Sequence, residues 1–180
     1  MGDKLHIGVL GTGIIVRGSH LPVLQSHPNA EVVAVCNMHP ESLASLAADF
    51  NIAKTYTDFS DMAADPDIDV VINALPNYLH APVSIQMLEA GKHVLCEKPM
   101  AENPGRADEM RVACRRNRVK LVIGHEWRFM PSYEMARSLI ARHAIGEVQL
   151  ITAISGSGLP NDASHLMDMF RYLLNDDECE

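Results

Sequence analysis

Five short apolar runs recur along the first two thirds of the chain, separated by longer segments that mix apolar and polar positions. The runs are rich in Val, Ile and Leu and hardly alternate, which is typical of strands covered on both faces of a parallel sheet. We therefore predict strands at Leu5–Leu10, Glu31–Cys36, Val70–Ala74, His93–Cys96 and Lys120–Gly124.

The segments between these runs carry helix start and stop signals. Pro40 suits a first helical turn, Asn103 is a suitable N-cap, and Gly91 suits a helix end. The helices predicted from these signals and from apolar spacing are Glu41–Phe50, Ala81–Ala90 and Pro104–Asn117. Alternating strands and helices with right-handed crossovers predict an α/β fold, a Rossmann-like doubly wound parallel sheet, over residues 1–124.

The pattern changes after Gly124. In the last segment, Leu166, Phe170, Leu173 and Leu174 fall on one helical face. Residues 125–180 are therefore predicted to begin a second, incomplete α+β domain. Its expected elements are a helix over Pro131–His143, a strand over Glu147–Ser155 and a helix over Asp162–Leu174.

Composition narrows the possible classes of function. The chain has 180 residues, 47% of them apolar, and a net charge of −8, which argues against nucleic-acid binding. Its four cysteines are scattered, which favours reduced thiols in a cytoplasmic protein. No apolar run reaches the roughly 18 residues of a membrane span. The nine histidines show no metal-ligand spacing, so no metal is expected.

The first predicted strand runs directly into Gly11-Thr12-Gly13-Ile14. In a dinucleotide-binding loop the first glycine permits the tight turn, and the second lets a pyrophosphate approach the backbone beside a helix N-terminus. Val16 stands where a third glycine or alanine is usual. The alternative is a plain turn, but the position after the first strand of a βαβ unit favours nucleotide binding.

Asn37 follows the second predicted strand, where dinucleotide-binding folds commonly carry an acidic residue that reads the ribose. An asparagine can bond a ribose hydroxyl and does not repel a 2′-phosphate. NAD and NADP both remain open, with a slight tilt towards NADP. The alternative role of Asn37 is simply to start a turn.

Glu97-Lys98-Pro99 directly follows the run His93–Cys96. A lysine there lies at the carboxyl edge of a parallel sheet, where open α/β sheets bind their ligands. Taken alone, Lys98 is a surface lysine at the end of a strand.

With these residues in place, the chain resembles the glucose–fructose oxidoreductase / inositol dehydrogenase / MocA (Gfo/Idh/MocA) family of NAD(P)-dependent oxidoreductases. The matching pieces span nearly the whole chain in the family's order. They are Gly8–Gly13, Asp69–His80, Gly91–Pro99, Arg128–Pro131 and His165–Asp168.

The resemblance implies roles for particular residues. The segment that matches Leu75-Pro76-Asn77 lines the nicotinamide side of the cofactor, and the one that matches His80 lies nearby. Glu97 and Lys98 take the places of a motif whose lysine contacts the substrate hydroxyl or carbonyl, and whose proline is often joined by a cis bond. A lysine beside cofactor and substrate can exchange a proton.

The family's second catalytic element is an aspartate four residues before a histidine. His165 matches that histidine, but Asn161 stands at the aspartate position. Asn161 can position a hydroxyl and cannot act as a general base, so proton transfer would fall on Lys98 and His165. The alternatives are an N-cap role for Asn161 or Asp162, and pairing of His165 with Asp168 on one helix face.

The resulting hypothesis is an NAD(P)-dependent oxidoreductase that moves a hydride between nicotinamide and a secondary alcohol or carbonyl of a sugar, cyclitol or related small molecule. The chain looks short for the family, and a completed second domain would favour a homo-oligomer. No nucleic-acid or membrane partner is expected. The rival hypothesis is a nucleotide-binding protein without catalysis, either a redox sensor or a degenerate family member.

Overall fold

The computed structural model describes residues 4–156 and 162–175. The chain divides into two units, Met1–Ile123 and Gly124–Glu180.

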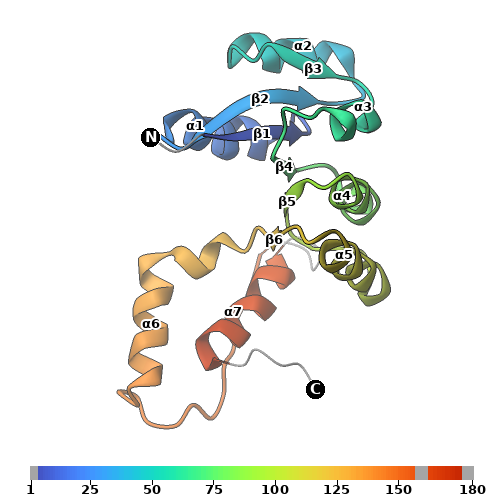
Figure 1. The fold of residues 1–180 in the computed structure, drawn as a ribbon. Coiled ribbons are helices and arrows are strands. Elements are labelled where there is room, and N and C mark those ends of the chain that lie inside the picture. The colour runs from blue at the N-terminus through green and yellow to red at the C-terminus, as the bar shows by residue number, and fades with distance from the viewer. Residues whose placement is uncertain (1–3, 157–161, 176–180) are drawn as a thin grey trace. The chain divides into compact units, whose positions relative to one another are not determined.

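The first unit is built on a six-stranded parallel sheet with the order β3-β2-β1-β4-β5-β6 (Figure 1). All five predicted strands are present, within a residue or so of their expected ends. The sequence prediction missed β3, which is only three residues long and polar. The strands are β1 Leu5–Leu10, β2 Ala30–Cys36, β3 Lys54–Tyr56, β4 Val70–Asn73, β5 His93–Cys96 and β6 Leu121–Ile123.

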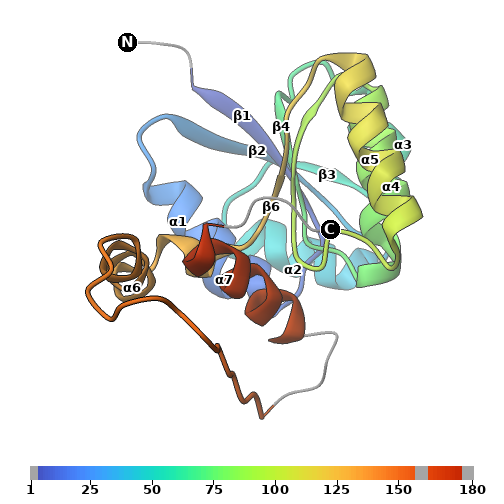
Figure 2. The same ribbon diagram turned by 90° about the horizontal axis from the view of Figure 1, so that it is seen from below.

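Helices cover both faces of this sheet, as a doubly wound fold requires. Figure 2 shows α3, α4 and α5 together on one face, with α1 and α2 on the other. The elements on the α1 side are a π-helical turn η1 Val16–His20, α1 Leu21–Ser26 and α2 Pro40–Asp49. The others are α3 Phe59–Ala64, the 3-10 turn η2 Asn77–Leu79, α4 His80–Glu89 and α5 Pro104–Asn117.

Alternate strand residues feed two separate cores. Leu10 and Val71 belong to the cluster shared with α3, α4 and α5, whereas Val9 and Ile72 belong to the cluster shared with α1 and α2. Burial on both faces explains why the strands read as continuous apolar runs.

Helix α5 shows how residues at its two ends start and stop a helix. The side chain of Asn103 accepts a hydrogen bond from the Arg106 N–H at 3.0 Å, which confirms the predicted N-cap. Pro104 occupies the first turn, where it forfeits no helical hydrogen bond. The helix ends at Asn117, and the capping residue Arg118 that follows has a left-handed φ of 55°.

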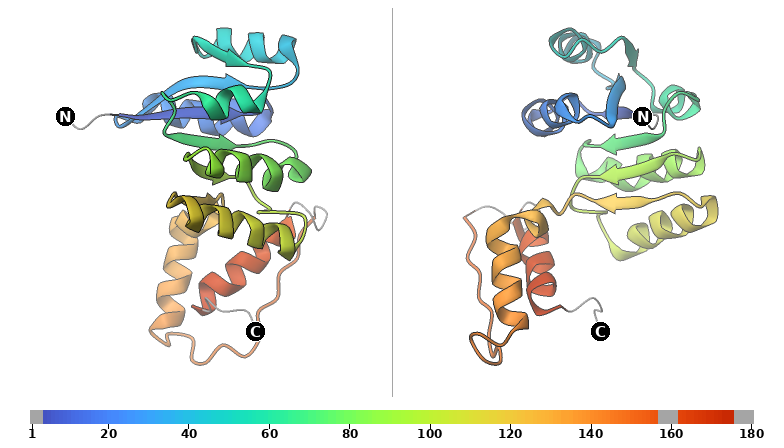
Figure 3. Two further views of the ribbon diagram at one scale, coloured as in Figure 1. Left: turned by 45° about the vertical axis from the view of Figure 1, so that its right-hand side comes forward. Right: turned by 60° about the vertical axis from the view of Figure 1, so that its left-hand side comes forward.

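The second unit holds a 3-10 turn, η3 Glu126–Phe129, and two helices, α6 Pro131–Ala141 and α7 Ser164–Leu174, which pack against each other (Figure 3). Both helices were predicted. The predicted strand Glu147–Ser155 is wrong, because this segment has no regular secondary structure. A strand needs a neighbour that pairs with its backbone groups, and the described part of this unit offers none.

No helix among the described residues is long and apolar enough to span a membrane.

A polar cluster around Asp65 ties together the segments that flank α3. One carboxylate oxygen accepts from Lys54 Nζ at 3.0 Å and from the Tyr56 hydroxyl at 2.8 Å, and the other accepts from the Asp67 N–H at 2.9 Å. The buried Lys92 amine donates to the Asp65 carbonyl at 2.6 Å. Burial raises the pKa of Asp65, but the hydrogen bonds to its carboxylate from the Asp67 N–H, Tyr56 and Lys54 outweigh it and hold the pKa below its usual value.

We expect Asp65→Asn to lower the free energy of unfolding by about 1.5–3 kcal/mol at pH 7, since it weakens hydrogen bonds to a buried charged group. The folded-state pKa is depressed, so this contribution is present above about pH 4 and is lost as the pH falls through the folded-state value. Urea unfolding at pH 7 and pH 3 checks this, with the exposed Asp61→Asn as control. A deficit equally large at both pH values would contradict it.

Candidate functional site

The parallel register places four loops at one edge of the sheet. Leu10 is level with Cys36 on one side and with Asn73 on the other, and Asn73 is level with Cys96. The first residues after these strands continue the pattern: the N–H groups of Gly11, Ala74 and Glu97 donate across to the carbonyls of Cys36, Leu10 and Asn73. The loops that begin at Gly11, Asn37, Ala74 and Glu97 therefore share the carboxyl edge.

The two glycines of the first loop differ in what they need. Gly11 has a φ of +102°, and a Cβ built on it would lie 2.7 Å from the Ala74 carbonyl oxygen. The protein itself therefore requires this glycine. A Cβ on Gly13 would meet nothing within 4 Å, so the fold leaves open space there.

The helix that follows the loop begins with the π-helical turn η1. Val16, which replaces the usual small residue, is fully buried in the core on the α1 side. Ile14 has 92% of its surface exposed, so an apolar side chain stands free beside the loop. The wide turn accommodates a valine where a tightly packed α-helix would favour glycine or alanine.

Asn37 is held by its neighbours rather than projecting freely. Its Nδ2 donates to Thr12 Oγ1 at 2.6 Å, and its Oδ1 accepts from the His39 N–H at 2.9 Å. Thr12 in turn donates to Ser42 Oγ at 3.2 Å. This chain of hydrogen bonds joins the glycine loop to the start of α2. The bond between the His39 N–H and Asn37 Oδ1 also forms a turn, which was the alternative role considered for Asn37.

A cleft of about 360 Å³ opens along these loops. It brings together Gly11, Thr12, Gly13, Asn37, Leu75 and Pro76 from the predicted site. The predicted residues Ile14, Asn77, His80, Glu97 and Lys98 do not line it. The sequence prediction missed six lining residues, most of them adjacent to predicted ones: Met38, His39, Phe59, Ala74, Tyr78 and Leu79.

His80 lies beneath the loops and is 1% exposed. Its Nδ1 is 2.7 Å from the Pro99 carbonyl oxygen and its Nε2 is 2.8 Å from that of Leu75. Both ring nitrogens are thus engaged with the protein backbone. Beside it, the buried Asn73 donates to the His80 carbonyl and to Ser84 Oγ and accepts from the Leu75 N–H. These contacts fix the β4 and β5 loops to each other.

Glu97-Lys98-Pro99 begins directly after β5, and the Lys98–Pro99 peptide bond is cis, as the resemblance implies. Glu97 pairs with His20, with 2.8 Å between Oε1 and Nε2. Burial raises the pKa of Glu97, but the His20 hydrogen bond, the His20 charge and the Lys98 N–H together hold it below its usual value.

Burial raises the pKa of the Cys36 and Cys96 thiols to about 12, which makes both poor nucleophiles.

In the second unit, His165 is 5% exposed and stacks on Trp127, with ring centroids 4.4 Å apart. Its Nε2 lies 3.6 Å from a Glu126 carboxylate oxygen, while its Nδ1 is buried without a hydrogen-bond partner among the described residues. Asp168 pairs with Arg128 through two hydrogen bonds of 2.8 and 2.6 Å, and not with His165.

Asn161 lies outside the described residues, so its predicted role stays a prediction. Within residues 4–156 and 162–175, no group of three or more His, Cys, Asp or Glu side chains could hold a metal ion.

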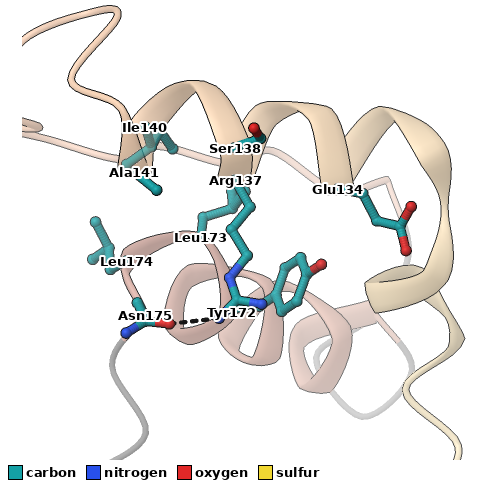
Figure 4. A pocket seen from close by; sticks show the side chains of 9 residues that line it. All are labelled: Glu134, Arg137, Ser138, Ile140, Ala141, Tyr172, Leu173, Leu174 and Asn175. Atoms are coloured by element: carbon teal, nitrogen blue, oxygen red, sulfur yellow. Dashed lines mark hydrogen bonds between the residues drawn. The ribbon is translucent and has the colours of Figure 1, made fainter.

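A second hollow, of about 690 Å³, lies between α6 and α7 (Figure 4). Its arginine is already engaged: Arg137 donates to Asn175 at 2.5 Å and lies 4.5 Å over the Tyr172 ring. None of the predicted site residues lines this hollow. The cleft at the carboxyl edge is therefore the better candidate for a functional site.

We expect Gly11→Ala to lower the free energy of unfolding by about 1–3 kcal/mol, because alanine is strained at this φ and its methyl group would meet Ala74. Gly13→Ala, the matched control, should change it by no more than about 0.5 kcal/mol. Urea unfolding of both variants measures the difference. Equal losses would show that Gly11 is not constrained as described.

The model of the Gfo/Idh/MocA family, described as an oxidoreductase family with an NAD-binding Rossmann fold, matches residues 5–125. The trans-1,2-dihydrobenzene-1,2-diol dehydrogenase of Xenopus tropicalis is 34% identical over 149 residues, which are 83% of this chain and 44% of that protein. The levoglucosan dehydrogenase of Pseudarthrobacter phenanthrenivorans is 30% identical over 208 residues, covering 97% and 52%.

Among solved structures, scyllo-inositol dehydrogenase from Lactobacillus casei with bound NAD(H) and scyllo-inositol superposes with a TM-score of 0.85 at 23% identity. The match covers 95% of this chain and 56% of that one, and at this identity it shows a shared fold. The chain spans about half the length of the curated relatives it matches.

Proposed function

The chain belongs to the Gfo/Idh/MocA family of oxidoreductases, and from that premise we propose that it takes part in hydride transfer on a bound nicotinamide dinucleotide. The substrate class we propose is a secondary alcohol or carbonyl of a sugar, cyclitol or related small molecule. The observation that carries the proposal is the shared edge of the sheet, where the glycine loop, Asn37, Leu75–Pro76 and Lys98 all emerge from parallel strands.

The residues at this edge fit a dinucleotide. The open space over Gly13 gives a pyrophosphate room to approach the backbone at the start of a helix. Asn37 follows β2, where dinucleotide-binding folds commonly read the ribose, and Leu75 and Pro76 add apolar side chains to the lining of the same cleft. The exposed Ile14 adds a further apolar contact beside the loop.

The cofactor supplies the hydride chemistry, and the protein supplies orientation and a proton. Lys98 is proposed to hold the proton of the reacting hydroxyl, since the β5 loop places it one strand away from the cleft wall at Leu75. His165 assists and Asn161 positions the substrate hydroxyl. Stacking on Trp127 fixes the orientation of the His165 ring, which suits it to this role.

Cofactor preference is proposed to include NADP as well as NAD. Asn37 brings no negative charge to the end of β2, and the neighbouring His39, which lines the cleft, has a side chain that can donate a hydrogen bond. A 2′-phosphate would therefore meet an amide and an imidazole at this position rather than a repelling carboxylate. This arrangement supports the slight tilt towards NADP.

One departure from the family favours a second candidate function, a cofactor-binding protein without catalysis. The family's aspartate position holds Asn161, which cannot act as a general base. A protein that bound NAD(P)H and turned over none of a panel of polyols and sugar ketones would support this second function.

Lys98→Met should reduce turnover by at least about 10²-fold, because removing the amine removes a proton donor and acceptor worth this much. Affinity for NADH should stay within about threefold, since the cleft itself is untouched. Fluorescence titration and steady-state rates measure the two effects, with Lys120→Met as control. Unchanged turnover would remove Lys98 from the mechanism.

Asn37→Asp should weaken NADPH binding by at least about tenfold and leave NADH binding within about threefold, because a carboxylate repels the 2′-phosphate and can still accept from a ribose hydroxyl. The ratio of the two dissociation constants is the readout. If NADPH bound the variant and the native chain equally well, Asn37 would not face the ribose.

A further inference from the structure

One contact joins the helix after the glycine loop to the lysine segment after β5. His20 Nε2 lies 2.8 Å from Glu97 Oε1, although the two residues are 77 positions apart in the sequence. The His20 and Glu97 side chains are 18% and 14% exposed. A pair this sheltered is held in one geometry more firmly than a surface ion pair.

His20 is connected to the glycine loop through its own backbone. It ends η1, and the N–H of Arg17 in the same turn donates to the Gly13 carbonyl at 3.1 Å. The N–H of Leu21 donates back to the Val16 carbonyl, which closes the wide turn. The position of the imidazole is therefore set by the segment that begins at the glycine loop.

Glu97 passes this constraint on to Lys98. Its second carboxylate oxygen accepts from the Lys98 N–H at 3.3 Å, and its own N–H donates to the Asn73 carbonyl at 2.9 Å. On the other side of the segment, His80 holds the Pro99 carbonyl. The backbone that carries the Lys98 amine is thus fixed both before and after it.

We propose that His20 is a positioning residue for Lys98, acting through Glu97, so that the glycine loop and the lysine are held in a fixed relation. The inference rests on the proposed function, because that function assigns proton transfer to the Lys98 amine. His20 needs no contact with cofactor or substrate. Its effect is to keep the amine in place while a substrate is bound, and a displacement of about 1 Å can cost about 10²-fold in rate.

The test compares His20→Leu, which removes the donor, with His20→Gln, which keeps one. His27→Leu is the control, since His27 is an exposed histidine of the same region. Amide hydrogen exchange at Lys98 and the carboxyl titration of Glu97 are followed by NMR. If His20→Leu fails to fold, the shorter His20→Asn, which retracts the donor, takes its place.

In His20→Leu we expect exchange at the Lys98 amide to speed up by at least about tenfold, because its acceptor is released. The pKa of Glu97 should rise, since the histidine that lowers it is gone. His20→Gln should restore slow exchange, and His27→Leu should change neither quantity. If exchange and the Glu97 titration were the same in His20→Leu as in the native chain, the proposal would be overturned.

Turnover separates positioning from mere stabilisation. His20→Leu should lower kcat by about 10- to 100-fold while the affinity for NADH stays within about threefold, with partial recovery in His20→Gln. A kcat equal to that of the native chain would overturn the proposal. The NMR measurements need no cofactor, so they decide the role of His20 even if the native chain bound no dinucleotide, a result that would contradict the proposed function alone.

Discussion

The register of the parallel sheet is the constraint on which the rest of the structure depends. The last residues of the four central strands are level with one another: Cys36, Leu10, Asn73 and Cys96. The loops that follow these strands therefore begin at the same edge of the sheet. A slip of one residue in β4 would exchange Val71 and Ile72 between the two cores and withdraw Asn73 from the row. Burial on both faces is therefore what places the candidate site.

The polar groups at this edge are then locked by backbone contacts rather than by one another alone. Asn73 and His80 are fully buried and bond carbonyl and N–H groups of the β4 and β5 loops. Thr12, Asn37 and Ser42 bond one another, and Asn37 and Ser42 also bond the His39 N–H and carbonyl, which joins the glycine loop to the start of α2. Such satisfied networks hold loops rigidly, and rigid loops are what a site for precise chemistry needs.

Much of the fold could be predicted from the sequence, because strands that are buried on both faces need apolar residues at nearly every position and so appear as apolar runs. The short edge strand β3 escaped this logic, since Lys54-Thr55-Tyr56 has little apolar surface to bury. The strand predicted over Glu147–Ser155 was wrong, because a strand-like composition does not by itself supply a neighbouring strand to pair with. The glycine loop, Asn37 and Lys98 could be found from local motifs, whereas the partnership of His20 with Glu97 depends on tertiary structure and leaves no local signal.

A dinucleotide is proposed to lie across the carboxyl edge of the sheet with its nicotinamide end towards Lys98. A crystal structure of the chain with NADH tests it most directly. We expect the pyrophosphate over Gly13 and the adenosine ribose at Asn37. The Lys98 amine should face the space next to the reactive ring carbon, so that a substrate oxygen there would lie within about 3 Å of it. A dinucleotide bound at any other surface, or a ring facing away from Lys98, would contradict it.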